Sequence, residues 1–183
     1  MEALDRHAVE WLAGLHWPVV TPVMKALTDI GAHGIVWLVI GLAVAIWRRR
    51  PLVILVLAVA EEISSYTDGL LKSAIGRVRP PLADPRVHPS IPVPHDPSMP
   101  SGHAMLAFTG AVILAAAVPR ARWALLVLAG GIALSRVYLG VHYPSDVLVG
   151  AALGAGIGAG AVVALRFGEG AVRSWRHGAA HRG

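Results

Sequence analysis

The sequence contains no cysteine, so disulfide bonds and thiolate chemistry are both excluded. Its first ten residues include Glu2, Asp5 and Glu10 and lack the positive region of a secretory signal peptide, so we expect no cleaved leader. A metal centre is not expected, because no grouping of His, Asp and Glu outside the motifs described below has the spacing of metal ligands. Any chemistry must therefore come from hydroxyl, imidazole, carboxyl and cationic side chains.

The sequence also lacks the continuous basic face of a nucleic-acid-binding module, although its formal net charge is +5. Its arginines instead gather between apolar runs or after the last one. These positions are Arg48, Arg49, Arg50, Arg120, Arg122, Arg166, Arg173, Arg176 and Arg182. This is the positive-inside pattern of cytoplasmic loops, so we predict no nucleic-acid partner.

Long apolar runs dominate what is present: hydrophobic residues make up 55% of the sequence, and the mean hydropathy is positive. The runs are about 20 residues long, as a bilayer-spanning helix requires, and they lack the amphipathic stripes of soluble helices. We therefore predict an all-α fold, a polytopic membrane helix bundle that forms one domain over residues 1–183. The five expected spans cover residues 31–47, 52–71, 103–118, 123–139 and 146–165.

The segment before the first span, residues 1–30, fits two descriptions. Its apolar residues recur at helical spacing, and Trp11 and Trp17 suit a membrane interface, but Pro18 and Pro22 interrupt the pattern. We predict an amphipathic helix on the outer leaflet. The alternative is a sixth, poorer span, which would place the amino terminus in the cytoplasm.

The last span repeats small residues at intervals of four, from Gly150 through Gly154 to Gly158. This spacing predicts close helix–helix packing inside the bundle rather than assembly with another chain. The stretch is not a nucleotide-binding loop, because no strand precedes it and no Walker-type lysine follows it.

Three short motifs stand at the ends of the apolar runs. They are Lys72 with Arg79-Pro80, then Pro100-Ser101-Gly102-His103, and then Ser135-Arg136 with His142 and Asp146. Together they supply cations for phosphate oxygens, a nucleophile, an acid for the leaving group and a carboxylate that can orient the nucleophile. The pattern therefore predicts a phosphate-handling site.

The order of the spans places these motifs on one side of the membrane. If the arginine-rich loops at 48–50 and 119–122 are cytoplasmic, the connections at 72–102 and 136–145 both lie on the opposite side. The tail, residues 166–183, then lies in the cytoplasm. We therefore expect the motifs to meet in one active site on the non-cytoplasmic face.

Two of the motifs carry histidines, and each has a plainer interpretation. His142 and Asp146 are four residues apart at a helix start, so the carboxylate can fix the imidazole tautomer or simply cap the helix. Ser101, Gly102 and His103 can present a hydroxyl and backbone N–H groups to a phosphate, or they can form only a turn.

The cations Lys72, Arg79 and Arg136 can bind phosphate or extend to lipid head groups from the helix ends. Asp68 lies four residues before Lys72, so we expect an ion pair between them. Lipid contacts alone do not explain cations at all of these ends together with two histidines. The combination favours one shared site, in which three protein cations replace metal ions, and we predict no metal requirement.

The connection from Pro80 to Pro100 holds eight of the 13 prolines and has no periodicity, so we expect neither helix nor strand there. We predict that it forms a lid or rim over the site, with His88 and His95 as loop residues without a catalytic role. Glu61 and Glu62 fall midway along the second span, where charge is costly. They either face the bundle interior, which we favour, or line a polar crevice to the site.

In these motifs, from Lys72 to Asp146, the chain resembles the type 2 phosphatidic acid phosphatase superfamily of membrane lipid phosphatases. Soluble acid phosphatases and vanadium haloperoxidases share this signature. The resemblance implies a two-step displacement without a cofactor, in which His142 attacks phosphorus and forms a phosphohistidine. Asp146 would orient His142, and His103 would protonate the leaving oxygen. The implied phosphate-binding residues are Lys72, Arg79, Arg136, Ser101 and Gly102.

The site recognises phosphate, and no residue pattern identifies the lipid tail or the oligomeric state. The expected substrate is a lipid phosphate from the outer leaflet of a plasma membrane. It could be an undecaprenyl or decaprenyl diphosphate or phosphate-sugar, phosphatidylglycerophosphate, or phosphatidate. The alternatives are a non-catalytic lipid-phosphate binding or transport protein and a haloperoxidase-like enzyme with vanadate at the phosphate position.

Overall fold

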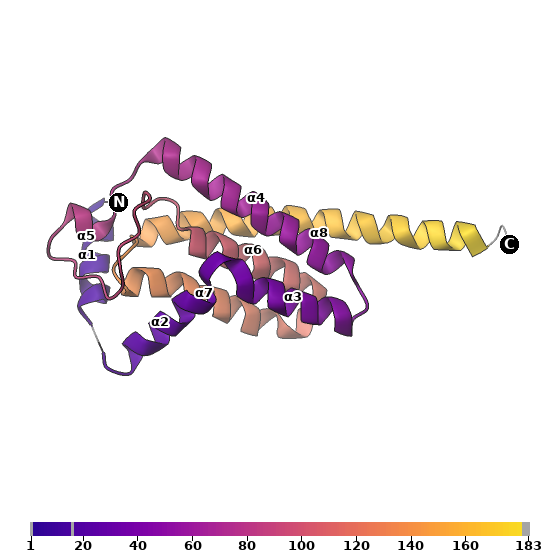
Figure 1. The fold of residues 1–183 in the computed structure, drawn as a ribbon, viewed down its shortest axis with the longest axis horizontal. Helices are drawn as coiled ribbons and strands as arrows, with labels where there is room; N and C mark the ends of the chain where they lie inside the picture. The colour runs from indigo at the N-terminus through magenta and orange to yellow at the C-terminus, as the bar shows by residue number, and fades with distance from the viewer. Residues whose placement is uncertain (1, 16, 181–183) are drawn as a thin grey trace.

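The computed structural model describes residues 2–15 and 17–180, with the backbone alone for Glu2 and 171–180. Every regular element in these residues is a helix, which confirms the predicted all-α fold (Figure 1). The α-helices are α1 (Glu2–Gly14), α2 (Val20–Ile30), α3 (Ile35–Trp47), α4 (Leu52–Ile75), α5 (Pro80–Ala83), α6 (Gly102–Ala117), α7 (Arg122–Tyr138) and α8 (Pro144–Ala180). Two short 3₁₀ turns, η1 (Ala32–Gly34) and η2 (Pro119–Ala121), precede α3 and α7.

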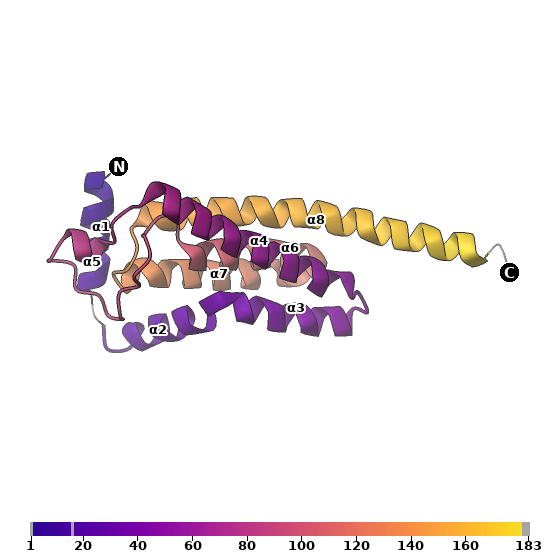
Figure 2. The ribbon, with the colours of Figure 1, turned by 45° about the horizontal axis from the view of Figure 1, so that its top comes forward.

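Helix α6 lies at the centre of the bundle and packs against α8, α7 and α4. The long helices run along one axis, whereas α1 lies across one end of the bundle (Figures 1 and 2). Large apolar side chains fill the core between them, including Trp37, Leu57, Met105, Ile113 and Ile132. Because α6 is apolar on all sides, it suits this enclosed position.

Helix α8 approaches the backbone of α6 through its small residues. A Cβ atom at Gly150 would collide with the Ser101 carbonyl, and one at Gly154 would collide with the Met105 carbonyl. At Gly158 a Cβ would lie 3.0 Å from the Thr109 carbonyl oxygen. The prediction of close helix–helix packing is therefore confirmed. This packing fixes the start of α8 against the start of α6.

By length and apolar composition, residues Pro119–Tyr138 and Pro144–Gly170 can each cross a bilayer. The bent pair Val20–Ile30 and Ala32–Trp47 makes a third crossing if it counts as one span. Helix α6 is apolar but has only 16 residues. The α4 helix is longer, yet it carries several ionisable side chains. The expected number of five or six spans therefore stays a prediction.

The described part of residues 1–30 forms two helices rather than the single amphipathic helix that we predicted. Helix α1 ends at Gly14, and α2 begins at Val20 with Pro22 in its first turn, where a missing N–H costs little. Helix α2 packs against α7 and meets the segment Ala32–Trp47 at an angle of 53°. The bend contains two residues with left-handed backbone angles, His33 (φ 55°) and Gly34 (φ 70°).

The connection after α4 is mostly irregular, as predicted, but our expectation of no helix is wrong at its start. Residues Pro80–Ala83 form the one-turn helix α5, which proline permits in a first turn because those N–H groups have no intrahelical partner. The loop then runs from Asp84 to Ser101 and contains His88 and His95. Helices α4 and α8 also extend past the predicted ends of their spans.

Candidate functional site

The three sequence motifs meet around one cavity of 380 Å³ at the end of the bundle that α1 crosses. Helix α4 contributes its last turns, α6 its first turn, and α7 its last turn, and the loop before α8 closes the ring. Six of the eight predicted site residues line the cavity. They are Lys72, Arg79, Gly102, His103, Arg136 and His142. Ser101 and Asp146 lie behind this lining, and both are fully buried.

His142 is buried in the loop between α7 and α8, with its two ring nitrogens facing different partners. The Nη1 atom of Arg79 lies 3.1 Å from Nε2, and the Asp146 Oδ2 atom lies 3.5 Å from Nδ1. Because a guanidinium can only donate, Nε2 must accept with its lone pair, and the proton is on Nδ1. The pKa of His142 is lowered to about 4, because burial and the Arg79 and Arg136 charges outweigh the contact with Asp146. A neutral imidazole can act as a nucleophile through Nε2 once Arg79 turns from that nitrogen to a phosphate oxygen.

Asp146 holds both the histidine loop and the start of α8. Its Oδ2 atom accepts hydrogen bonds from the Tyr143 N–H at 2.9 Å and the Ser98 hydroxyl at 2.5 Å. The carboxylate therefore satisfies a backbone N–H at the helix start, whereas its role toward His142, whose Nδ1 makes no hydrogen bond to the described residues, stays a prediction. From their spacing of four we expected His142 and Asp146 to lie on one helix face. The helix begins only at Pro144, so His142 lies before it, and a turn brings the two side chains together.

His103 lies in the first turn of α6, next to Gly102. A Cβ atom at Gly102 would lie 2.8 Å from Asp68 Oδ2, so a larger residue would collide with α4. The Ser101 N–H donates to the Asp146 carbonyl at 3.0 Å, while its buried hydroxyl makes no hydrogen bond within the described part of the chain. The turn thus joins the starts of α6 and α8 through the main chain.

Lys72 and Arg79 share an acidic partner that the motifs did not predict. The Lys72 Nζ atom lies 2.9 Å from Asp68 Oδ2, which confirms the expected ion pair, and 2.5 Å from Asp96 Oδ2. Arg79 Nη2 donates to Asp96 Oδ1 at 2.8 Å, and its Nε atom donates to the Asp96 carbonyl at 2.8 Å. Burial raises the pKa of Asp96, but Lys72 and Arg79 together lower it to about 2. The Asp96 carboxylate is therefore already paired with both Lys72 and Arg79.

Arg136 connects the site to the amino-terminal segment. Its side chain is buried, and its Nη1 atom donates to the Thr28 hydroxyl of α2 at 2.5 Å. Its Nε atom has no hydrogen-bond partner among the residues that the structure describes. A buried guanidinium with an unused donor can bind a phosphate oxygen. No sequence pattern indicated Thr28.

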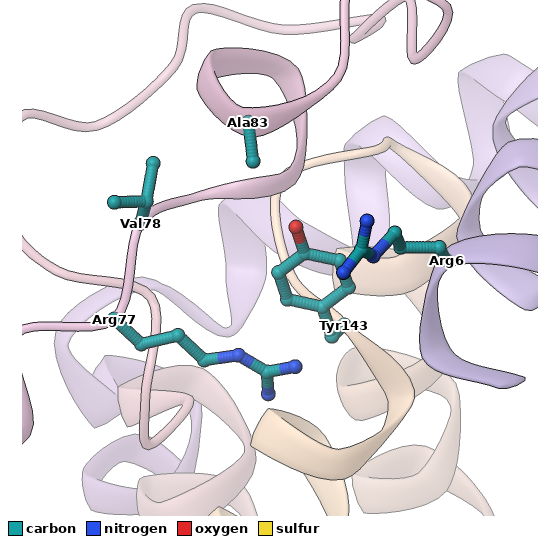
Figure 3. Close-up of a pocket in the computed structure, with 5 residues that line it drawn as sticks. All are labelled: Arg6, Arg77, Val78, Ala83 and Tyr143. Atoms are coloured by element: carbon teal, nitrogen blue, oxygen red, sulfur yellow. The ribbon is translucent and has the colours of Figure 1, made fainter. Parts of the chain in front are cut away.

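Arg77, between Lys72 and Arg79 in the sequence, lies beside the site rather than in it. It forms ion pairs with Asp5 of α1 at 2.8 Å and with Asp146 at 2.5 Å. Its guanidinium also lies 4.1 Å from the centre of the Tyr143 ring. A separate cavity of 230 Å³ opens there, lined by Arg6, Arg77, Val78, Ala83 and Tyr143 (Figure 3). Arg77 thereby joins α1 to the carboxylate behind His142.

The two glutamates of α4 have different environments, and each matches one of the predicted alternatives. Glu61 is buried in the bundle interior, against Gly34. Glu62 is exposed and lines the cavity with His33 and Ser65. His88 and His95 do not line it. No group of three His, Asp or Glu side chains within residues 2–15 and 17–180 is arranged for a metal ion.

The sequence of this chain is similar to those of known proteins. The profile of the PAP2 superfamily matches residues 51–168. The decaprenylphosphoryl-5-phosphoribose phosphatase of Mycobacterium tuberculosis is 36% identical over 146 residues, which are 78% of this chain and 78% of that protein. The undecaprenyl-diphosphatase of Sulfolobus acidocaldarius is 33% identical over 123 residues, 67% of this chain and 60% of that protein.

Two solved structures share the fold. The transmembrane PAP2 type phosphatidylglycerolphosphate phosphatase of Bacillus subtilis has a TM-score of 0.70 and 25% identity, covering 93% of this chain and 87% of that one. The LpxE protein of Aquifex aeolicus has a TM-score of 0.76 and 24% identity, covering 87% of this chain and 94% of that one. The helical arrangement is therefore shared over most of the length.

Proposed function

Because the chain belongs to the PAP2 superfamily, we propose that it is a membrane lipid phosphatase that works through a phosphohistidine on His142. One observation carries the proposal: His142 and His103 line the same cavity as Lys72, Arg79 and Arg136. A site for binding alone would need the cations but neither a nucleophile nor an acid. The presence of both favours turnover over the alternative of a non-catalytic binding or transport protein.

In the first step, the Nε2 lone pair of His142 attacks phosphorus while the bond to the lipid oxygen breaks. His103 gives its proton to that oxygen, so a neutral lipid alcohol leaves. A phosphate dianion beside His103 favours the protonated ring that this step requires. Asp146, which faces Nδ1–H at 3.5 Å, stabilises the positive charge on His142 as the N–P bond forms.

In the second step, water attacks the phosphohistidine, the N–P bond breaks and inorganic phosphate leaves. The water gives its proton to the now neutral His103, which restores both histidines. Lys72, Arg79 and Arg136 hold the non-bridging oxygens in both steps, and the Gly102 N–H adds a donor at the start of α6. Phosphoryl transfer needs charge neutralisation and in-line positioning above all, and these cations supply the charge.

The proposal places the site at the non-cytoplasmic face of a plasma membrane, in a single domain with five or six spans. Opposite ends of α4 support this placement, since Arg50 lies just before the helix and Lys72 lies near its end. Arg50 pairs with Glu169 of α8 at 2.6 Å, so the arginine-rich turn and the carboxyl-terminal part of α8 share the far end of the bundle. We assign the 48–50 and 119–122 turns and residues 166–183 to the cytoplasm, and α1 to the outer interface.

Phosphate release from purified lipids tests this function. The panel contains a polyprenyl diphosphate, phosphatidylglycerophosphate, phosphatidate and a polyprenyl phosphoribose phosphate. We expect wild type to hydrolyse at least one of them with or without EDTA, and His142→Ala to reduce kcat at least about 10³-fold. His88→Ala, in the loop outside the cavity, is the matched control and should retain activity.

Labelled substrate should also leave an acid-labile, base-stable phosphate on wild type and none on His142→Ala. Lipid binding without phosphate release from any lipid would support the binding or transport alternative. Inactivation by EDTA would contradict the assignment of charge neutralisation to protein cations alone.

A further inference from the structure

The cavity is longer than a phosphate group requires. Lys72 and Glu62 both line it, and they are ten residues apart on α4, which corresponds to about 15 Å along the helix axis. Lys72 and Arg79 stand together at one end, joined through Asp96. The other end must therefore contain whatever is attached to the phosphate.

Away from Lys72, the lining residues that α4 and η1 contribute are polar, and none of them is a lysine or an arginine. From Lys72 toward Glu62, the lining face of α4 carries Asp68 and Ser65. The Glu62 side chain is exposed, and its carboxylate forms no ion pair with any residue that the structure describes. A carboxylate without a cation accepts hydrogen bonds from hydroxyl groups and repels a second phosphate.

His33 of η1 completes this end, and its backbone is held in an unusual conformation. Its φ of 55° lies in the left-handed region, which costs a residue other than glycine on the order of 1 kcal/mol or more. The following Gly34 packs against α4, since a Cβ atom there would lie 2.7 Å from Glu61 Oε2. The strained turn is therefore fixed against the turn of α4 that also carries Glu62. Such strain is concentrated at ligand-binding sites.

The position of His103 indicates that the leaving group would point toward the end of the cavity that Glu62 lines. His103, the proposed acid, would contact the leaving oxygen, and Leu106, one turn further along α6, also lines the cavity. The group beyond the scissile bond would therefore extend from His103 along α6 toward Glu62 and Ser65.

We propose that Glu62, Ser65 and His33 form a subsite for a hydroxyl-bearing unit, a sugar or a glycerol, attached directly to the scissile phosphate. The inference rests on the proposed phosphatase function and narrows its substrate class. A hydroxyl can exchange hydrogen bonds with the carboxylate, the Ser65 hydroxyl and the imidazole. An alkyl or acyl leaving group would leave these groups unpaired, and a diphosphate would bring charge toward Asp68 and Glu62. Sites built to bind a hydroxyl discriminate strongly against analogues that lack it.

Two lipids with identical acyl chains test the subsite. In phosphatidylglycerophosphate the scissile phosphate is attached to a glycerol with a free hydroxyl, whereas in phosphatidate it is attached to an acylated glycerol. We expect wild type to favour the first lipid at least about tenfold in kcat/KM, as one charge-assisted hydrogen bond allows. In Glu62→Ala the ratio should fall about tenfold, with smaller falls in Glu62→Gln and Ser65→Ala.

Ser73→Ala is the matched control, because Ser73 lies on the same helix, bonds to the Gly69 carbonyl at 2.9 Å and does not line the cavity. It should keep the wild-type ratio, and thermal unfolding of every variant checks folding. An unchanged ratio in the folded Glu62 and Ser65 variants would overturn the subsite, as would a wild-type preference for phosphatidate. Failure of wild type on every lipid phosphate is a separate result, because it would overturn the phosphatase function itself.

Discussion

Asp96 binds Lys72 and Arg79, the two cations that the proposed mechanism also assigns to the substrate phosphate. Its carboxylate lies 2.5 Å from Lys72 Nζ and 2.8 Å from Arg79 Nη2, while nearly half of its side-chain surface is exposed. With a pKa of about 2, it stays charged at any pH near neutrality. An incoming phosphate must therefore compete with this internal anion for the two cations.

The substitution Asp96→Asn should strengthen inhibition by inorganic phosphate and by vanadate. Loss of one charge-assisted contact at each cation lowers the cost of phosphate entry, so we expect the inhibition constants to fall about tenfold. Because Asp96 is ionised above about pH 2, the effect should be the same at pH 6 and pH 8. Inhibition constants from phosphate-release assays measure it.

Asp84→Asn provides the control for this substitution, since Asp84 lies in the same loop but pairs with Arg86 at 2.6 Å, outside the cavity. It should leave both inhibition constants unchanged. Weaker inhibition in Asp96→Asn would instead show that the carboxylate holds Lys72 and Arg79 in position for phosphate.

The sequence predicted which residues line the cavity where those residues belong to a motif of fixed spacing. Lys72, Arg79 and His103 belong to short motifs, and the structure places them around one cavity. Asp96 belongs to no such pattern, although it is the one carboxylate between Pro85 and Ser101. Its partners become apparent only when the loop folds back over α4. The same holds for Glu62, because helical spacing alone does not say which of two adjacent glutamates faces the cavity.

Among the elements, α6 and α8 determine how accurately the site is built. Their backbones touch at Gly150 and Gly154, and the Ser101 N–H bonds to the Asp146 carbonyl at 3.0 Å. The repeat of small residues predicted this contact because close packing requires them at that spacing. Helix ends were less predictable: α4 continues four residues past residue 71 to a left-handed Gly76, a common helix terminator.

Gly154→Ala should destabilise the protein by roughly 1–3 kcal/mol, because the new methyl group would collide with the Met105 backbone, which cannot move aside as a side chain can. Thermal unfolding in detergent measures the effect. Gly156 lies on the same helix, and no atom lies within 4 Å of the position that a Cβ would take. Gly156→Ala should therefore leave the stability unchanged or raise it. Equal melting temperatures for the two variants would contradict the close-packed interface.

At the scale of the whole molecule, the amino-terminal helices are part of the site rather than an appendage. Helix α1 reaches it through Asp5 and Arg77, and α2 reaches it through Thr28 and Arg136. Amphipathic spacing predicted a single helix in residues 1–30, and it predicted neither the break between α1 and α2 nor these contacts. They depend on how the chain returns over the end of the bundle, and no local pattern in the sequence encodes that path.

Asp5→Asn should loosen α1 and slow catalysis. Asp5 is buried, pairs with Arg77 at 2.8 Å and accepts hydrogen bonds from the Ser145 N–H at 3.0 Å and the Ser145 hydroxyl at 2.5 Å. Loss of the charge weakens these bonds, so amide exchange across residues 2–14 should rise about tenfold and kcat should fall severalfold. Hydrogen exchange by mass spectrometry measures the first effect.

Glu10→Gln is the comparison, because Glu10 is on the same helix and pairs with the largely exposed Arg86, a surface contact of little energetic value. We expect wild-type exchange and activity for it. Unchanged exchange across residues 2–14 in Asp5→Asn would show that apolar packing around Val9 and Ala13 alone docks α1.

The main-chain bond between Ser101 and Asp146 holds His103 and His142, the two imidazoles of the proposed mechanism, in one rigid frame. The subsite residues Glu62 and Ser65 of α4, and His33 of the turn before α3, line the same cavity but stand outside that frame. Substitutions at Glu62, Ser65 or His33 can therefore change the head group that evolved variants accept, while His103 and His142 keep their relative positions.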